Sequence, residues 1–107
     1  MFNKNILCEY RKALEGVTYK TLSYGSKTSL SEFKLAKGAV IPNHSHPHEQ
    51  TGYMISGRMT FTIEGKKYLT EPGDGWSIPG NTEHSVEVHE DSVLVEVFSP
   101  PREDYLP

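Results

Sequence analysis

The chain contains 107 residues, of which 36% are hydrophobic and 23% are charged, and its formal net charge is −3 at pH 7. A chain of this length has room for one hydrophobic core, so we expect a single domain over residues 1–107. No run approaches the roughly 18 apolar residues of a membrane span, and Lys and Arg form no stripe that could follow a phosphate backbone. We therefore expect neither a membrane nor a nucleic acid as partner.

The first 16 residues are expected to form an N-terminal arm. Charged side chains occur throughout this arm, and no apolar stretch is long enough for a signal peptide, so we expect a cytoplasmic protein. Residues 9–14 carry the only helical periodicity, and it is weak. Cys8 is the single cysteine and has no internal disulfide partner. We expect it to pack as a small apolar residue.

From Val17 onward the sequence predicts short β-strands separated by turns. Polar and apolar residues alternate over 58–63, as in a half-buried strand, and Glu64-Gly65 is typical of a two-residue hairpin connection. Strands of about five residues with turns every 8–12 residues indicate a β-sandwich or barrel. A short helical turn is expected after Ser99. The expected strands are residues 30–35, 53–55, 58–63, 66–69, 76–78, 85–88 and 93–98.

Three of the five histidines lie close together, at His44, His46 and His48. Residues two apart on an extended chain point to the same face, so His44 and His46 can present two imidazoles together. Neutral imidazole nitrogens are common ligands of transition metals. The same parity includes His48 and Gln50, but Pro47 interrupts the extended run. Periodicity alone therefore does not choose the third ligand.

The spacing around this cluster forms two motifs. In residues 38–57, five residues separate Gly38 from His44, one separates His44 from His46, three precede Gln50 and six precede Gly57. In residues 73–88, five residues separate Gly73 from Pro79, and four more precede His84. Together these motifs resemble those of the cupin superfamily. The resemblance implies an all-β fold, a single antiparallel jelly-roll β-barrel, and it implies the metal ligands His44, His46, Gln50 and His84.

The sequence departs from the usual cupin pattern at three positions. Gln50 stands where a glutamate is usual, Asn81 replaces a glycine in the turn after Pro79, and Val88 replaces an asparagine. Three imidazoles and a neutral amide would leave a divalent ion its full double charge, which favours anions at its open positions. A nitrogen-rich set of this kind suits Zn, Ni, Fe, Cu or Mn, so the sequence does not name the metal.

A second group of candidate residues lies near the C-terminal tail, residues 99–107. Glu96 and Phe98 share one face of a strand, and Arg102 follows two prolines. Carboxylates transfer protons, and arginine binds carboxylates with two parallel hydrogen bonds. In the alternative interpretation, Glu96 pairs with a lysine at the surface, Phe98 packs in the core and Arg102 is solvated.

The histidine cluster and this tail together resemble the KdgF-type pectin-degradation cupins. Those proteins convert cyclic 4,5-unsaturated uronates into linear keto forms. The resemblance implies that Glu96, Phe98 and Arg102 are catalytic residues, with Glu96 at the position where the group has an aspartate.

Three functions remain open from the sequence: an enzyme acting on a small acidic sugar, a metal-dependent dioxygenase of a small molecule, and a non-catalytic module that binds a small ligand. His48 and His89 fall outside the motifs. We expect His48 to have a loop or supporting role and His89 to lie at the surface. Since the apolar content is low, we also expect a homodimer, formed through outer strands or by exchange of the N-terminal strand.

Overall fold

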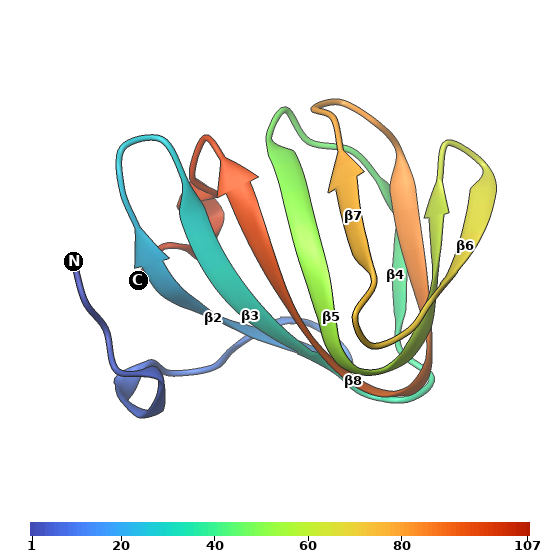
Figure 1. Ribbon diagram of the computed structural model, residues 1–107, viewed down its shortest axis with the longest axis horizontal. Helices are drawn as coiled ribbons and strands as arrows, with labels where there is room; N and C mark the ends of the chain where they lie inside the picture. The colour runs from blue at the N-terminus through green and yellow to red at the C-terminus, as the bar shows by residue number, and fades with distance from the viewer.

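The structure is a computed structural model that describes all residues 1–107, and it consists mainly of antiparallel β-strands (Figure 1). Two short 3₁₀ helices, η1 (Asn5–Leu7) and η2 (Glu103–Tyr105), lie near the ends of the chain. The strands are β1 (Arg11–Leu14), β2 (Val17–Tyr24), β3 (Ser29–Leu35), β4 (Val40–His44), β5 (Glu49–Ile63), β6 (Lys66–Thr70), β7 (Gly75–Ile78) and β8 (His84–Ser99). The expected all-β jelly-roll fold is confirmed.

The two long strands, β5 and β8, pair with each other and belong to both walls of the molecule. The first wall follows the order β1-β2-β3-β8-β5, and β7 continues it along the first residues of β5. In the second wall, β4 pairs with the first residues of β8, and β6 pairs with the last residues of β5. The strands thus curve so that the two walls face each other, as Figure 1 shows, while the sheet remains open at its ends.

A bend in β5 lets this strand pass from one wall to the other. The register against β8 shifts between Met54 and Met59. Gly57 lies in this bend with φ 93°, and a Cβ atom there would lie 2.3 Å from Ser92 Oγ. Only glycine combines this backbone conformation with so close an approach. The sequence suggested two strands, at 53–55 and 58–63, because the bend interrupts the alternation that continues on both sides of it.

The same explanation applies to β8, which the sequence divided into residues 85–88 and 93–98. Along this strand, buried and more exposed side chains alternate on both sides of the interruption at 89–91. The inward-facing side chains meet those of β5 and β3 to form the core. Its twelve members are Val17, Tyr19, Phe33, Leu35, Met54, Met59, Phe61, Ile78, Val86, Val88, Leu94 and Phe98.

The weak helical periodicity of residues 9–14 does not produce a helix, because residues 11–14 form β1 and pair with β2. Gly16 has φ 78° and permits the tight connection between these strands. An isolated helix this short gains too few hydrogen bonds to compete with strand pairing. The arm preceding β1 is anchored by the buried Lys20, whose Nζ donates to the Asn5 carbonyl at 3.0 Å and to Asn5 Oδ1 at 2.7 Å.

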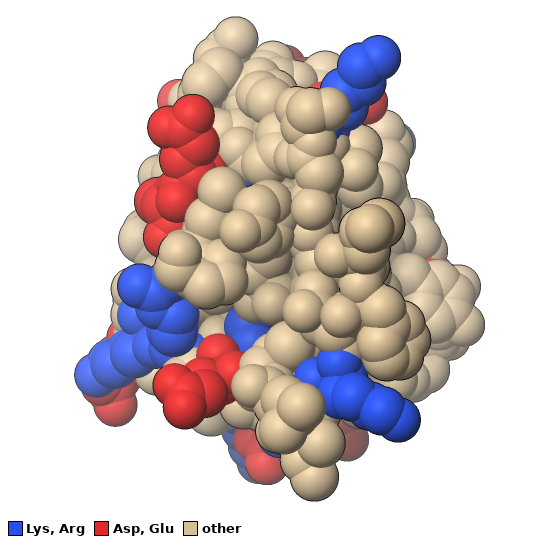
Figure 2. Space-filling view, turned by 90° about the vertical axis from the view of Figure 1, so that its left-hand side faces the viewer, with Lys and Arg blue, Asp and Glu red and all other residues tan.

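Two other local expectations, the hairpin connection and the turn after Ser99, are confirmed. Glu64 and Gly65 have φ 49° and 79°, as a two-residue hairpin between β5 and β6 requires. The turn expected after Ser99 is η2. No helix is long and apolar enough to cross a membrane. Figure 2 shows acidic and basic side chains interspersed at the margins of one face and a largely uncharged centre, so this face carries no stripe of one sign.

Candidate metal centre and active site

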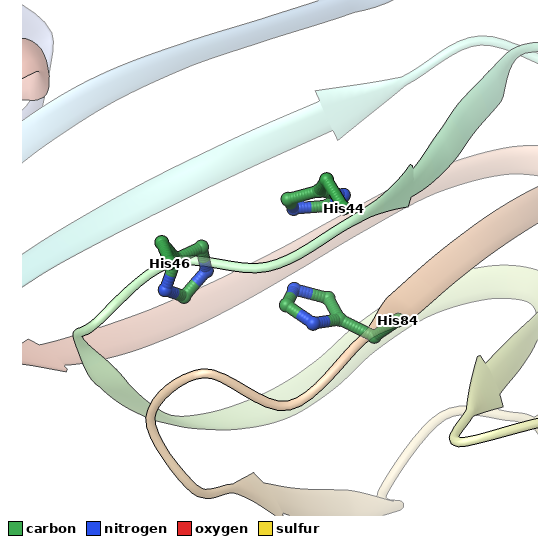
Figure 3. Close-up of side chains that lie close together, drawn as sticks. All are labelled: His44, His46 and His84. Atoms are coloured by element: carbon green, nitrogen blue, oxygen red, sulfur yellow. The ribbon is translucent and has the colours of Figure 1, made fainter.

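Three histidines from two segments that are distant in sequence lie close together (Figure 3). His44 ends β4, His46 lies in the following loop, and His84 begins β8. His44 and His84 are opposite each other in the pairing of β4 with β8. One ring nitrogen from each of the three residues lies within 4.8 Å of those of the other two. The two sequence motifs therefore converge, as the cupin resemblance implied.

Backbone carbonyls fix the orientation of all three rings. Each Nδ1 lies within hydrogen-bond distance of a carbonyl oxygen two residues away in sequence. A carbonyl only accepts, so Nδ1 carries the hydrogen and Nε2 keeps its lone pair. Such a bond orients an imidazole that binds a metal through its other nitrogen. The bonds run from His44 to Pro42, from His46 to His48 and from His84 to Thr82, at 2.8, 3.1 and 2.8 Å.

Burial keeps two of these imidazoles in the neutral form that a metal requires. Loss of hydration, with the nearby charge of Arg102, lowers the pKa of His46 to about 4. Burial also lowers the pKa of His84, which is 3% exposed. His46 Nε2 is buried and has no hydrogen-bond partner. An unpartnered buried nitrogen is costly unless another group binds it, so this atom is suited to hold a cation.

Gln50 presents an oxygen to the same region. Its side chain is buried, and its Nε2 donates to Oε2 of Glu96, which leaves Oε1 buried without a partner. An acceptor with no donor nearby is the second unsatisfied atom that a metal would satisfy. The three imidazoles and this amide oxygen fit the donor set implied by the cupin resemblance.

Glu96 is a buried carboxyl group beside the histidines. Glu96 is 8% exposed, and its Oε2 accepts hydrogen bonds from Nε2 of Gln50 and from Nε1 of Trp76, the latter at 3.0 Å. Burial raises the pKa of Glu96 to about 7, against the opposing effects of these two bonds and of the charge on Arg102. The alternative in which Glu96 pairs with a surface lysine is therefore wrong. A carboxyl group with a pKa this close to neutral can both accept and donate a proton.

Arg102 lies above Phe98 at the end of the chain. Its guanidinium carbon is 5.1 Å from the Phe98 ring centre and 4.2 Å from that of Tyr105. Nε and Nη2 donate to the two carboxylate oxygens of Asp104, at 3.0 and 2.8 Å. The Arg102 side chain is 14% exposed, so the solvated alternative is wrong here too. Nη1 makes no hydrogen bond within the protein, so its two N–H groups and the second N–H of Nη2 remain for a ligand.

One pocket contains every site residue expected from the sequence. Apolar side chains cover much of its wall, and Tyr105 of η2 also lines it. A largely apolar cavity with a few convergent polar groups is the usual form of a small-molecule site. The predicted residues that line it are His44, His46, Gln50, His84, Glu96, Phe98 and Arg102.

The two remaining histidines are placed as expected. His48 supplies the carbonyl that orients His46, while its own ring lies outside the three-histidine cluster. His89 is exposed, and its Nε2 lies 2.6 Å from Thr60 Oγ1. Sequence reasoning missed Trp76 and Asp104, which hold the two charged groups of the pocket. Only one residue separates Arg102 from Asp104, so spacing could have suggested this pair.

Comparison with known proteins agrees with this geometry. The family model for the cupin domain matches residues 31–99, which is more than half of the chain and includes both motifs. The chain belongs to the cupin family. The pectin degradation protein KdgF of Dickeya dadantii (strain 3937) is 33% identical to this cupin over 94 residues, which cover 86% of each protein.

A solved structure and a second curated protein add to this comparison. The structure of KdgF from Halomonas sp. superposes with a TM-score of 0.93 at 30% identity, covering 99% of this cupin and 98% of that chain. Quercetin 2,3-dioxygenase of Bacillus subtilis (strain 168) is 40% identical over 50 residues. That match covers 46% of this cupin and only 15% of the dioxygenase, so it concerns one segment.

Proposed function

We propose that this cupin is a metal-dependent enzyme that acts on a small acidic sugar and converts a cyclic 4,5-unsaturated uronate into its linear keto form. One observation carries the proposal: a metal-binding donor set, a carboxyl group with a pKa near 7 and an arginine share one pocket. The likeness to KdgF over most of both proteins supports the substrate class, since KdgF is a pectin degradation protein.

In this proposal, Nε2 of His44, His46 and His84 and Oε1 of Gln50 hold a divalent metal ion. Zn, Ni, Fe, Cu and Mn are all compatible with these donors. When bound, such an ion supplies Lewis acidity toward an oxygen of the substrate. The protein orients its own donors before any ion arrives, because the three Nδ1–H groups are already bonded to carbonyls.

Glu96 moves the proton that the isomerisation requires. Opening the ring breaks the bond between C1 and the ring oxygen, and the hydroxyl proton on C1 must leave. Conversion of the resulting enol to the ketone adds a proton at C4, so substrate and product are isomers and no other reactant is consumed. A carboxyl group with a pKa of about 7 can take the first proton and return one.

Arg102 and Phe98 position the sugar. The Arg102 guanidinium carries the positive charge nearest the histidines, and it can bind the uronate carboxylate through Nη1 or by exchange with Asp104. Phe98 packs in the core, as the alternative interpretation expected, but it also lines the pocket, where it can contact the ring carbons of the sugar.

The test is loss of the conjugated absorbance of an unsaturated uronate, measured with metal-loaded and chelator-treated protein. We expect acceleration only with metal, and the exposed-histidine variant His89→Ala should match the wild type. Decay that the loaded wild-type protein leaves unchanged would refute the proposal. A uronate that raises the melting temperature but emerges unchanged would instead indicate a non-catalytic binding module.

A metal-dependent dioxygenase is the second candidate, favoured by the segment shared with quercetin 2,3-dioxygenase. Three imidazoles with open positions also suit iron in oxygen chemistry. Oxygen uptake with a panel of catechols, thiols and diketones separates the two candidates, because the uronate isomerisation consumes no oxygen. Uptake together with no uronate activity would favour the dioxygenase.

We also propose that the protein forms a homodimer through the outer face of its first wall. Tyr53, Ile55 and Val97 are exposed on neighbouring strands β5 and β8, and Phe2 and Ile6 of the arm are more than 80% exposed. Apolar side chains gathered in this way are typical of an interface. Sedimentation equilibrium measures the mass directly, and a monomer at micromolar concentration would contradict the proposal.

A further inference from the structure

Trp76, Gly52 and Glu96 lie in one row across three neighbouring strands. In the pairing of β7 with β5, Trp76 is opposite Gly52, and in the pairing of β5 with β8, Gly52 is opposite Glu96. Neighbouring strands are about 4.8 Å apart, so the two outer residues of the row are separated by about twice that distance. Their side chains meet only if nothing projects from the strand between them.

Gly52 provides this gap. A Cβ atom at residue 52 would lie 2.2 to 2.4 Å from three atoms of the Trp76 indole, including Nε1. Its φ lies outside the left-handed region, unlike that of Gly57, so the backbone itself does not require glycine. Gly52 is therefore needed for the space it leaves, and the indole occupies that space. Glycine in the middle of a strand often marks so close an approach.

The indole that crosses Gly52 donates its only hydrogen-bonding proton to Glu96. Nε1 lies 3.0 Å from Oε2, and Gln50 Nε2 donates to the same oxygen. Oε1 of Glu96 makes no hydrogen bond within the protein. Both donors therefore hold one oxygen and leave the other for a substrate. On its other side the indole packs against Phe61, with ring centres 5.2 Å apart.

We propose that Trp76, seated over Gly52, is a positioning residue that fixes the Glu96 carboxyl group so that Oε1 faces the reacting sugar. This inference rests on the proposed function. It also explains how a glutamate can serve at this position. The longer side chain reaches over Gly52 to the indole, and the bond removes the rotational freedom that its extra methylene adds.

Trp76→Phe tests the role of the indole proton, because it keeps an aromatic ring against Phe61 and removes the donor. We expect kcat for the uronate to fall about tenfold or more, as for loss of a hydrogen bond to a charged group, while KM changes less than about twofold. Metal content should stay the same. Tyr68→Phe is the matched control, since Tyr68 lies on β6, which does not pair with β7, and is 44% exposed. An unchanged kcat in Trp76→Phe would overturn the proposal.

A spectroscopic measurement tests the contact without any substrate. Trp76 is the only tryptophan, so the ¹H–¹⁵N spectrum contains a single indole cross-peak. Bonding to a carboxylate should place this peak downfield, and Glu96→Ala should move it toward the position of a free indole. A peak that is the same in both proteins would refute the contact. If the wild type lacks uronate activity, the proposed function fails while this measurement still shows whether Trp76 holds Glu96.

Gly52 can be tested through its dependence on Trp76. Gly52→Ala should displace the indole, lower kcat at least as much as Trp76→Phe and shift the indole cross-peak. In a Trp76→Ala background the added methyl group has room, so Gly52→Ala should change kcat by less than about twofold. If Gly52→Ala lowers kcat by the same factor in the Trp76→Ala background as in the wild type, the inference is contradicted. If Gly52→Ala fails to fold alone but folds in the Trp76→Ala background, steric coupling between the two residues is supported.

Discussion

The two sides of the pocket are oriented by different kinds of contact. On the imidazole side, every ring is held by a backbone carbonyl two residues away. On the acid side, Glu96 is held by side chains 46 and 20 residues away in sequence, those of Gln50 and Trp76. The first arrangement depends on local backbone conformation, whereas the second depends on strand register and on the space above Gly52. Changes on the two sides should therefore have different consequences.

Removing an imidazole should have the largest effect, because it removes a metal donor. We expect His84→Ala to weaken metal binding by more than about a hundredfold, since even groups that only support a ligand contribute 10- to 100-fold. The increase in melting temperature on metal addition should disappear with it. Metal analysis of dialysed protein measures this, with His89→Ala as control. Retention of a full equivalent of metal would exclude His84 as a ligand.

Changing the carboxyl group should instead lower the rate without removing the metal. Glu96→Gln keeps the size of the side chain and an oxygen that accepts from Trp76 and Gln50, but it cannot transfer a proton. Loss of a general acid–base group typically lowers kcat by about 10²- to 10⁴-fold. Metal content and kcat for the uronate, measured on one preparation, separate the two effects. If metal is lost together with activity, the acid side is not independent of the imidazole side.

The same variant should reveal the energetic cost of the buried carboxylate in metal-free protein. The pKa of folded Glu96 is about 7 and its ordinary value is 4.5, so folding favours the protonated form. As pH rises from 4.5 to 7, the unfolded chain loses this proton first, and stability falls. By pH 8 the cost should be about 3 kcal/mol. Glu96→Gln should thus gain stability relative to wild type between pH 4 and pH 8 in urea unfolding.

Titration of His46 changes the free energy of unfolding with pH in the opposite direction, but it does so in both proteins. The difference in stability between wild type and Glu96→Gln therefore isolates the carboxyl group. The pKa of folded His46 is about 4, below its ordinary 6.5, and stability from this residue is lost as pH falls from 6.5 to 4. A stability difference that does not change with pH would show that the pKa of Glu96 is not raised.

Arg102→Lys should have a smaller effect, directed at binding. A lysine keeps the charge but cannot replace the planar guanidinium that stacks on Tyr105 and bonds to both oxygens of Asp104. We expect KM for the uronate to rise about tenfold, equivalent to roughly 1.4 kcal/mol, with kcat little changed. Steady-state kinetics with full metal occupancy measures both. An unchanged KM would show that Arg102 does not bind the substrate.

The difference between the two sides also explains what the sequence could predict. The proposed ligands His44, His46, Gln50 and His84 were implied by resemblance to the two cupin motifs, in which glycines and a proline mark turns at fixed spacings. Glu96 and Arg102 were found only through family resemblance, since strand parity does not show which face points inward. Trp76 was missed because its role depends on the register of three strands that are distant in sequence. The continuous strands β5 and β8 were also missed, because their bends interrupt the alternating pattern.

The smallest effect should come from a turn within the second motif. Asn81 stands where cupins usually have glycine; its φ is 63°, and its backbone N–H donates to the His46 carbonyl at 2.7 Å. This bond ties the second motif to the loop that carries a proposed ligand. An alanine in the left-handed region costs roughly 1–2 kcal/mol, whereas glycine adopts it freely.

We therefore expect Asn81→Ala to lower the free energy of unfolding by about 1 kcal/mol and to weaken metal binding slightly. Asn81→Gly should stay within about 0.5 kcal/mol of the wild type. Urea unfolding of metal-free protein gives the free energy of unfolding, and competition with a chelator gives the metal affinity. Equal losses in both variants would mean that the Asn81 side chain, rather than its backbone conformation, supports His46. The imidazole side would then share the dependence on distant side chains that distinguishes the acid side.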